Sequence, residues 1–226
     1  MTDLHTHILP GIDDGARTVE ESISLLRMQL KSGVNTVALT PHFKFSAAEQ
    51  PEFLLRRERS YNALSKAIDK HGLPIELILG AEVAFTTPLL ELDLDSLCYE
   101  GTKTILIELP MDHYPAYAGD MFYRLMLDGY TPLIAHAERY SYFTRKPGLL
   151  EKLTRGGALV QVNAGGLLKR RTRKRILKMI SGGLVHVLAS DTHSMDLRPP
   201  RLEKAVKVIE KKLGNETAQR LVNFEL

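Results

Sequence analysis

The chain has 226 residues, of which 44% are hydrophobic and 25% are charged, with one cysteine and no tryptophan. These values are typical of a globular protein, and they exclude a disordered chain, a collagen-like repeat and a disulfide scaffold. The net charge of +3 is too small to require a nucleic-acid partner, and none is expected. The sequence contains neither a signal-peptide pattern nor an apolar run of about 18 residues, so we expect a cytoplasmic protein.

Short apolar runs alternate with longer amphipathic segments along the chain, which is typical of repeated strand–helix units on a parallel sheet. Strands are predicted at 2–7, 35–41, 75–83, 103–109, 131–137, 158–164 and 185–190. Helices are predicted at 18–32, 47–71, 116–128, 147–155, 170–181 and 199–213. Thr18 and Glu21 have the spacing of a capping box at the first helix, and Gly33 follows its end. No linker divides the chain, so a single domain over residues 1–226 is expected.

Seven strand–helix units can close into a barrel or form an open, doubly wound sheet, and periodicity alone does not separate these folds. The polar residues are more informative, because strands buried on both faces should be apolar to their ends. Polar side chains nevertheless stand at the carboxyl ends of the predicted strands: His5, His7, His42, Glu82, Glu108, His136, Asn163, Asp191 and His193. Sites of parallel α/β folds are built at this end, so we expect these residues to meet in one cleft.

The spacing of these residues indicates a metal site. His5 and His7 stand at positions i and i+2 of an extended segment, which places both imidazoles on one side, and Asp191 and His193 have the same spacing. Burying these groups together without a cation would be unfavourable by several kcal/mol per unpaired charge. Imidazole and carboxylate ligands without thiolate fit Mn²⁺, Fe²⁺ or catalytic Zn²⁺. Because the candidate ligands outnumber those of one ion, we expect two or three ions, as in phosphoester hydrolysis.

Two arginines and two aspartates extend this predicted site. Arg139, in HAER, and Arg198, in DTHSMDLRPP, closely follow metal-competent residues, and a guanidinium binds phosphate oxygens in a bidentate manner. Taken singly, each arginine could also be a solvated loop charge. Asp13 and Asp14, in LPGIDDGARTVEE, either form an Asx-type turn, or one of them reaches a third ion.

Six motifs are distributed over nearly the whole chain. They are DLHTHILPGIDDGARTVEES near the N-terminus, TPH at 40–42, GAEV at 80–83, IELP at 107–110, AHAERY at 135–140 and SDTH at 190–193. Together they resemble the polymerase and histidinol phosphatase (PHP) superfamily, and within it the bacterial CpsB/YwqE-type tyrosine-protein phosphatases. The resemblance implies a distorted, TIM-like (β/α)7 barrel and a trinuclear, commonly manganese, site, in which Fe²⁺, Zn²⁺ or Mg²⁺ could replace Mn²⁺.

The resemblance also implies a role for each candidate residue. The first ion would be held by His5, His7, Glu82 and Asp191. The second would be held by Glu82, Glu108 and His136. The third would be held by His42, His193 and one of Asp13 and Asp14, of which Asp14 is favoured. Arg139 and Arg198 match positions that bind the substrate phosphate, and the residues expected to act in catalysis are Arg139, Arg198, Glu108 and His136.

The reaction that the resemblance implies is hydrolysis of phosphotyrosine by a metal-activated water, without a covalent intermediate. Glu108 favours this branch, because members that act on small phosphoesters tend to have His in its place. The family's usual substrate is the Tyr-rich tail of a membrane-associated bacterial tyrosine autokinase that controls capsular and exopolysaccharide synthesis. We therefore expect such a kinase as partner and a location peripheral to the membrane through it, and a homo-oligomer is left open.

Other interpretations also stay open. The chain could instead hydrolyse a small metabolite such as histidinol phosphate. The segment KRRTRKR, residues 169–175, has six basic side chains and could belong to an anionic-polymer-binding protein or form a solvated helix face. Aromatic residues that either line a phosphopeptide groove or pack the loops are Tyr114, Tyr117, Tyr140, Tyr142 and Phe143. A cysteine phosphatase requires a thiolate in a C-x5-R loop, a context that Cys98 lacks.

Overall fold

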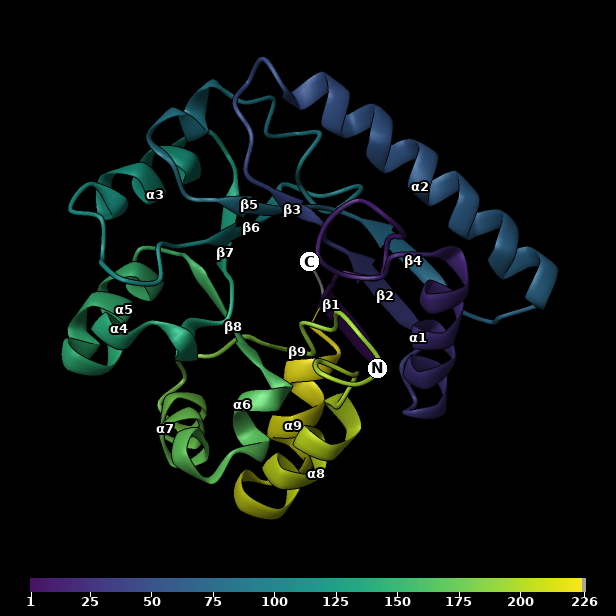
Figure 1. The fold of residues 1–226 in the computed structure, drawn as a ribbon. Helices are drawn as coiled ribbons and strands as arrows, with labels where there is room; N and C mark the ends of the chain where they lie inside the picture. The colour runs from purple at the N-terminus through teal and green to yellow at the C-terminus, as the bar shows by residue number, and fades with distance from the viewer. Residues whose placement is uncertain (225–226) are drawn as a thin grey trace.

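The computed structural model describes residues 1–224, and its strands form a parallel sheet that curls around a central axis (Figure 1). One part of the sheet has the strand order β1-β2-β4, and the other has the order β3-β5-β6-β7-β8-β9. The strands are β1 (Thr2–Thr6), β2 (Thr36–Leu39), β3 (His42–Phe43), β4 (Glu76–Leu79), β5 (Glu82–Ala84), β6 (Thr104–Glu108), β7 (Thr131–Ile134), β8 (Leu159–Asn163) and β9 (Val187–Ala189). The alternation of strands and helices agrees with the predicted α/β class.

The predicted strand at 75–83 is interrupted and forms β4 and then β5, so the expectation of one continuous strand there is wrong. The predicted strand at 35–41 forms β2, and after a break a second short strand, β3, follows beyond its predicted end. Pro41 stands at this break, where its ring removes a backbone donor from the ladder. The Glu82 N–H donates to the Pro41 carbonyl at 3.0 Å, and His42 pairs with Glu82 in register. The interruption therefore places two predicted ligands side by side.

The curl of the sheet brings its first strand beside the segment that follows its last. Thr6 forms a parallel bridge with Thr192, and the His7 N–H donates to the Thr192 carbonyl at 2.8 Å. The Asp191 N–H donates to the His5 carbonyl at 2.9 Å. These contacts bring residues from the two ends of the chain to the same place.

Apolar side chains fill the inside of the curled sheet. The cluster consists of Leu4, Ala38, Tyr99, Leu106, Leu133, Ala135, Val187 and Ala189. The ring of Tyr99 is buried, and its hydroxyl donates to the Leu4 carbonyl at 2.7 Å. This bond satisfies a polar group that would otherwise be costly to bury. The strands thus surround a packed core.

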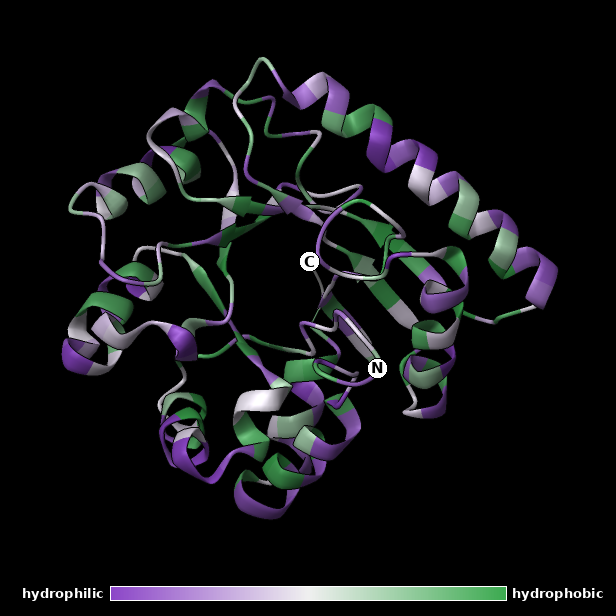
Figure 2. Cartoon of the chain, in the orientation of Figure 1, coloured by the Kyte–Doolittle hydropathy of each residue, from purple (hydrophilic) through white to green (hydrophobic). Residues whose placement is uncertain are grey.

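Nine α-helices lie outside the strands of the described region (Figure 1). They are α1 (Val19–Lys31), α2 (Gln50–His71), α3 (Ala118–Leu127), α4 (Ser141–Arg145), α5 (Pro147–Arg155), α6 (Ala164–Leu168), α7 (Arg170–Ser181), α8 (Leu202–Leu213) and α9 (Asn215–Val222). Short 3-10 helices are η1 (Thr87–Glu91) and η2 (Ala137–Arg139). The strands are mostly hydrophobic, whereas the helices carry both hydrophilic and hydrophobic residues (Figure 2). Among the helices within residues 1–224, none is long and apolar enough to span a membrane.

The ends of two helices differ from the sequence expectation for local reasons. At α1, the Thr18 hydroxyl accepts from the Glu21 backbone N–H at 3.3 Å. The Glu21 carboxylate, however, accepts from the backbone N–H of Arg17 at 2.7 Å instead of from that of Thr18. Half of the predicted capping box is therefore present. Helix α8 begins at Leu202 and not at 199, because two prolines precede it and proline disfavours a helical conformation in the residue before it.

Candidate metal centre

The strands and the segments that follow them bring the predicted ligands around one buried carboxylate, that of Glu82 at the start of β5. Glu82 is 1% exposed, and its Oε2 lies 2.9 Å from His42 Nδ1, 3.3 Å from His7 Nε2 and 3.4 Å from His5 Nε2. Its Oε1 lies 2.9 Å from His136 Nε2. Four imidazoles from three distant segments of the chain therefore converge on a single side chain.

The donor atoms form three groups in which all members lie within 4.8 Å of one another. The groups are His7, Asp14, His42 and His193; His5, His7 and Glu82; and His42, Glu82 and Glu108. The groups share members, so they form one continuous cluster.

His136 and Asp191 adjoin this cluster. His136 Nε2 lies 3.4 Å from Glu108 Oε1, in addition to its contact with Glu82. Asp191 Oδ1 lies 3.4 Å from His193 Nδ1 and 3.6 Å from His7 Nε2. The residues predicted from the strand ends thus come together in one place.

The two neighbouring aspartates of the first loop point to different partners. Asp14 Oδ1 lies 3.4 Å from His42 Nε2 and 3.5 Å from His193 Nε2, so it faces the cluster. An Asp13 oxygen instead lies 2.8 Å from His7 Nδ1 and accepts from the His42 backbone N–H at 3.0 Å. A carboxylate on the far nitrogen of a liganding imidazole fixes the orientation of the ring and its tautomer. Sequence spacing could not separate these two positions.

Gln161, a buried residue of β8, contacts the cluster and is a residue that the sequence did not predict there. Its Oε1 lies 3.2 Å from His5 Nδ1 and accepts from the His136 backbone N–H at 2.6 Å. Its Nε2 donates to Asn163 Oδ1, and Asn163 Nδ2 donates to Asp191 Oδ2, both at 2.7 Å. The signal was present in the strand, because Gln161 and Asn163 are two residues apart and so lie on the same face.

The backbone is strained where two of these residues are presented. His136 and Asp191, with φ of 33° and 54°, are the non-glycine residues of positive φ in the described chain. Such a conformation is unfavourable by of order 1–3 kcal/mol and persists only where the surroundings enforce it. Close packing also fixes the loop of the two aspartates, because a Cβ on Gly15 would lie 2.0 Å from the His7 carbonyl oxygen.

Strong electrostatic coupling accompanies this crowding. Burial opposes the charged form of His7, but its hydrogen bonds with Asp13 and Glu82 prevail and raise its pKa to about 10. Burial likewise opposes the charged form of His136, whose carboxylate partners raise its pKa to about 9. Burial, followed by the charge of His7, lowers the pKa of His193 to about 3. Protons therefore bind at some imidazoles and are excluded from others that are nearby.

The donor set fits divalent metal ions. Its members are imidazoles and carboxylates without a thiolate, which suits Mn²⁺, Fe²⁺ or catalytic Zn²⁺. The Nε2 of His193 is buried and has no hydrogen-bond partner within residues 1–224. A buried polar atom without a partner calls for an explanation, and an ion bound between His193 and Asp14 would provide one.

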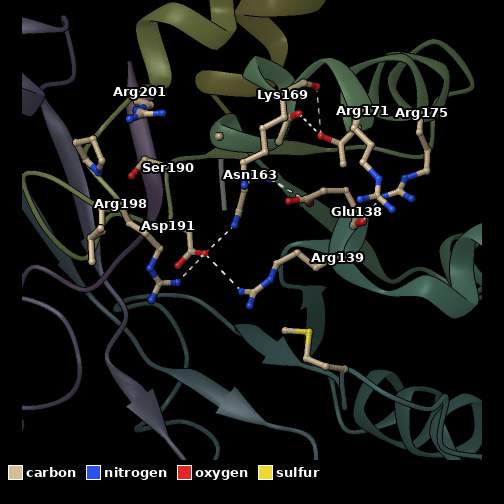
Figure 3. A pocket seen from close by; sticks show the side chains of 16 residues that line it. Glu138, Arg139, Asn163, Lys169, Arg171, Arg175, Ser190, Asp191, Arg198 and Arg201 are labelled. Atoms are coloured by element: carbon tan, nitrogen blue, oxygen red, sulfur yellow. Dashed lines mark hydrogen bonds and ion pairs between the residues drawn. The ribbon is translucent and has the colours of Figure 1, made fainter.

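Two arginines approach the cluster at its solvent side. Nη1 of Arg139 and Nη1 of Arg198 lie 3.7 and 3.5 Å from Asp191 Oδ2, and both guanidinium groups point toward this carboxylate (Figure 3). Nη2 of Arg198 lies 3.5 Å from Asp14 Oδ2. Their side chains are 43% and 39% exposed. Because they remain accessible, both can bind an anion that enters from solvent.

The aromatic residues of the loops mostly serve packing. Tyr140, Tyr142 and Phe143 are 0%, 8% and 5% exposed, and their rings contact one another. Tyr117 is 40% exposed, and its ring stacks on Phe85. Of the two interpretations of this set, the structure favours loop packing for the three buried rings.

The histidines not assigned to the cluster lie outside the three donor groups. His71 contacts Arg27, His113 contacts Asp112, and His186 Nδ1 lies 3.1 Å from the Val160 backbone nitrogen. These contacts agree with a structural or surface role.

A curled parallel sheet with imidazoles and carboxylates gathered at one end, and with arginines at the rim, forms the class of α/β site that can hold divalent ions beside an anionic ligand. The family model "Capsular polysaccharide synthesis, CpsB/CapC" matches residues 1–224, and the chain belongs to this family. The chain is 35% identical over 233 residues to the tyrosine-protein phosphatase YwqE of Bacillus subtilis (strain 168), covering 100% of this chain and 91% of that protein. It is 30% identical over 231 residues to the tyrosine-protein phosphatase CpsB of Streptococcus agalactiae, covering 98% and 94%.

Solved structures agree with this assignment. A chain from the crystal structures of YwqE from Bacillus subtilis and CpsB from Streptococcus pneumoniae, described as unique metal-dependent tyrosine phosphatases, superposes with a TM-score of 0.87. It is 34% identical, and the match covers 99% of this chain and 92% of that chain. The lactonase Lmo2620 from Listeria monocytogenes superposes with a TM-score of 0.67 at 13% identity, covering 98% and 92%, and is similar in fold alone.

The environment of Cys98 predicts an unreactive thiol. The residue is 4% exposed, and burial raises its pKa to about 12, so roughly one thiol in 10⁴ is ionised at pH 8. In a thiol titration at pH 8, we expect the folded protein to react at least about 100-fold more slowly than after unfolding in denaturant. Rapid reaction of the folded protein would contradict this expectation and reopen a thiolate role.

Proposed function

We propose that this chain is a metal-dependent tyrosine-protein phosphatase, a phosphoric monoester hydrolase that acts on phosphotyrosine in capsule synthesis. The observation that carries the proposal is the pair of accessible guanidinium groups beside a cluster of imidazole and carboxylate donors. Relatives at 30–35% identity over nearly the whole chain bear the name tyrosine-protein phosphatase. The description of the matching family supports the link with the capsule.

The proposed metal ligands are the sets that the resemblance implies, which overlap with the three groups of donors and add His136 and Asp191 beside them. One ion would be held by His5, His7, Glu82 and Asp191. A second would be held by Glu82, Glu108 and His136. A third would be held by Asp14, His42 and His193, in agreement with the direction in which Asp14 points. Glu82 would belong to both the first and the second set, and Mn²⁺ is the proposed metal, with Fe²⁺, Zn²⁺ or Mg²⁺ as alternatives.

The chain's own residues would position the substrate and the ligands. Divalent ions, when bound, lower the pKa of a water and polarise a phosphoryl group. Arg139 and Arg198 would bind the phosphate oxygens and stabilise the charge that they carry in the transition state. Asp13 and Gln161 would hold the rings of His7 and His5 in their liganding orientation. The leaving phenolate is a modest base, so strong general-acid catalysis is less necessary than for an alkyl ester.

The finer fold and the biological context belong to the same proposal. The bridge between Thr6 and Thr192 supports a closed (β/α)7 barrel of the PHP type, formed by one domain over residues 1–226. The partner would be a membrane-associated bacterial tyrosine kinase, whose phosphorylated tail is the substrate, and the protein would act in the cytoplasm. The kinase, the location and a homo-oligomer stay predictions from the sequence.

The two aspartates of the first loop provide a test of the ligand assignment. We expect Asp14→Asn to lose about one ion per chain, because it removes a direct ligand. Asp13→Asn should keep every ion and weaken metal affinity about 10–100-fold, because it only loosens the orientation of His7. Metal titration followed by elemental analysis measures both, and Asp196→Asn, at an exposed position of a nearby loop, is the control. Loss of an ion from the Asp13 variant alone would reverse the assignment.

Substrate preference and the arginines test the proposed activity. With metal bound, the protein should hydrolyse a phosphotyrosine peptide with a kcat/KM at least about 100-fold higher than that for histidinol phosphate, because its relatives bear the name tyrosine-protein phosphatase. Arg198→Gln should lower kcat/KM for the peptide by about 10²–10³, because a charged donor to the phosphate is lost. Arg145→Gln, an exposed arginine of α4, is the matched control and should leave kcat/KM unchanged. Faster turnover of histidinol phosphate would favour the small-metabolite alternative.

A further inference from the structure

A large cavity continues from the two phosphate-facing arginines along α6 and the start of α7 (Figure 3). Its volume is about 700 Å³, which lies within the range of about 300–1,000 Å³ typical of ligand pockets. Its basic lining residues are Arg139, Lys169, Arg171, Arg175, Arg198 and Arg201. The acidic ones are Glu138 and Asp191. The cavity is therefore much larger and more basic than a single phosphate requires.

The two acidic side chains do little to neutralise this cavity. Asp191 already faces both Arg139 and Arg198. Glu138 is 5% exposed, and its Oε2 accepts from the Asn163 backbone N–H at 3.2 Å. The cavity wall thus keeps an excess of positive charge.

Three of the basic residues have neither an ion-pair partner nor a side-chain hydrogen bond in the described chain. Lys169, Arg171 and Arg201 are exposed, and their side chains make neither salt bridges nor hydrogen bonds within residues 1–224. Arg175 differs, because its guanidinium donates to Thr144 Oγ1 at 2.8 Å and to the Glu138 carbonyl. Arg175 therefore stabilises the wall, whereas the other three are available to a ligand.

The basic segment 169–175 is divided among separate tasks, which its sequence alone did not reveal. The Arg173 guanidinium donates to the Leu167 carbonyl at 2.7 Å and so satisfies a carbonyl at the C-terminal end of α6. Arg170 and Lys174 are exposed but do not line the cavity. Lys169, Arg171 and Arg175 do line it. Part of the charge of this segment therefore lines one cavity. A helix face that is only solvated would not be expected to place its charges in this way.

We propose that this cavity is a second anion subsite, which binds an acidic group of the substrate polypeptide while Arg139 and Arg198 hold the phosphate to be hydrolysed. The inference rests on the proposed function. A polypeptide is favoured because the cavity is continuous with the phosphate-facing arginines, so one occupant reaches both. Met111 and Leu197, 36% and 90% exposed, line the same cavity and offer apolar contact to an aromatic ring.

The acidic group is a carboxylate or a second phosphate, since guanidinium groups bind both. The enzyme would therefore prefer phosphotyrosine with acidic neighbours over phosphotyrosine in a neutral sequence. Because the three available cations are exposed, their effect should be strongest at low ionic strength and weaken as salt is added.

The test compares three phosphotyrosine peptides with the metal-loaded enzyme. One peptide has neutral neighbours, one carries glutamates and one carries phosphoserine at the same positions, so the last two distinguish the two sources of charge. At low salt, the wild type should show a KM at least about fivefold lower for one or both anionic peptides. Arg171→Gln/Arg201→Gln should remove this preference. Arg170→Gln/Lys174→Gln, which removes the same charge outside the cavity, should retain it.

Each outcome bears on the inference. Equal KM values of the wild type for all three peptides overturn it and leave the proposed function intact, as does equal loss of preference in both double variants. If the metal-loaded protein hydrolyses no phosphotyrosine peptide, the proposed function fails and the subsite fails with it. If the double variant does not fold, the single variants Arg171→Gln and Arg201→Gln should each lower the preference about twofold, and unchanged preference in both overturns the inference.

Discussion

The arrangement of this protein depends on one buried carboxylate that four imidazoles share. Glu82 lies among His5, His7, His42 and His136 at the carboxyl ends of strands that are far apart in the sequence. A charge in such a place is tolerated only with partners of opposite charge. The curl of the sheet, the break at Pro41 and the pairing of His42 with Glu82 all supply those partners. The fold can thus be understood as the means by which these side chains meet.

A second set of contacts holds the first set in place. Asp13 fixes His7, and Gln161 connects His5 with Asn163 and Asp191. The backbone at His136 and Asp191 has an unfavourable positive φ, which the surrounding contacts of the site must enforce. In metal-free protein, the pKa values of neighbouring imidazoles are therefore expected to shift in opposite directions, upward for His7 and downward for His193. Divalent ions bound as proposed would replace protons at several of these imidazoles together.

Much of the site could be predicted because it obeys a simple positional rule. Polar side chains at the ends of apolar strands have no packing role, so His5, His42 and Glu82 stood out without any knowledge of the fold. Helices α5 and α7 were predicted at their observed bounds, since Pro147 begins one and glycines follow both. Short helices such as α4 and α6 were missed, because five residues are too few for a periodic pattern.

The sequence could not predict in which direction individual side chains point. Asp13 and Asp14 are chemically identical neighbours, and only the loop around Gly15 decides which one faces the cluster. The uses of the basic segment 169–175 likewise depend on how the turns of α7 meet the cavity. Both distinctions arise from packing between distant segments, which no local spacing encodes.

The most direct measurement of the central claim is the metal content of the purified protein together with its rate of phosphotyrosine hydrolysis, before and after treatment with a chelator. We expect two or three divalent ions per chain, loss of hydrolysis on their removal, and recovery when Mn²⁺ is added back. Phosphotyrosine hydrolysis by a protein that holds no metal, with a rate that the chelator does not change, would contradict the central claim.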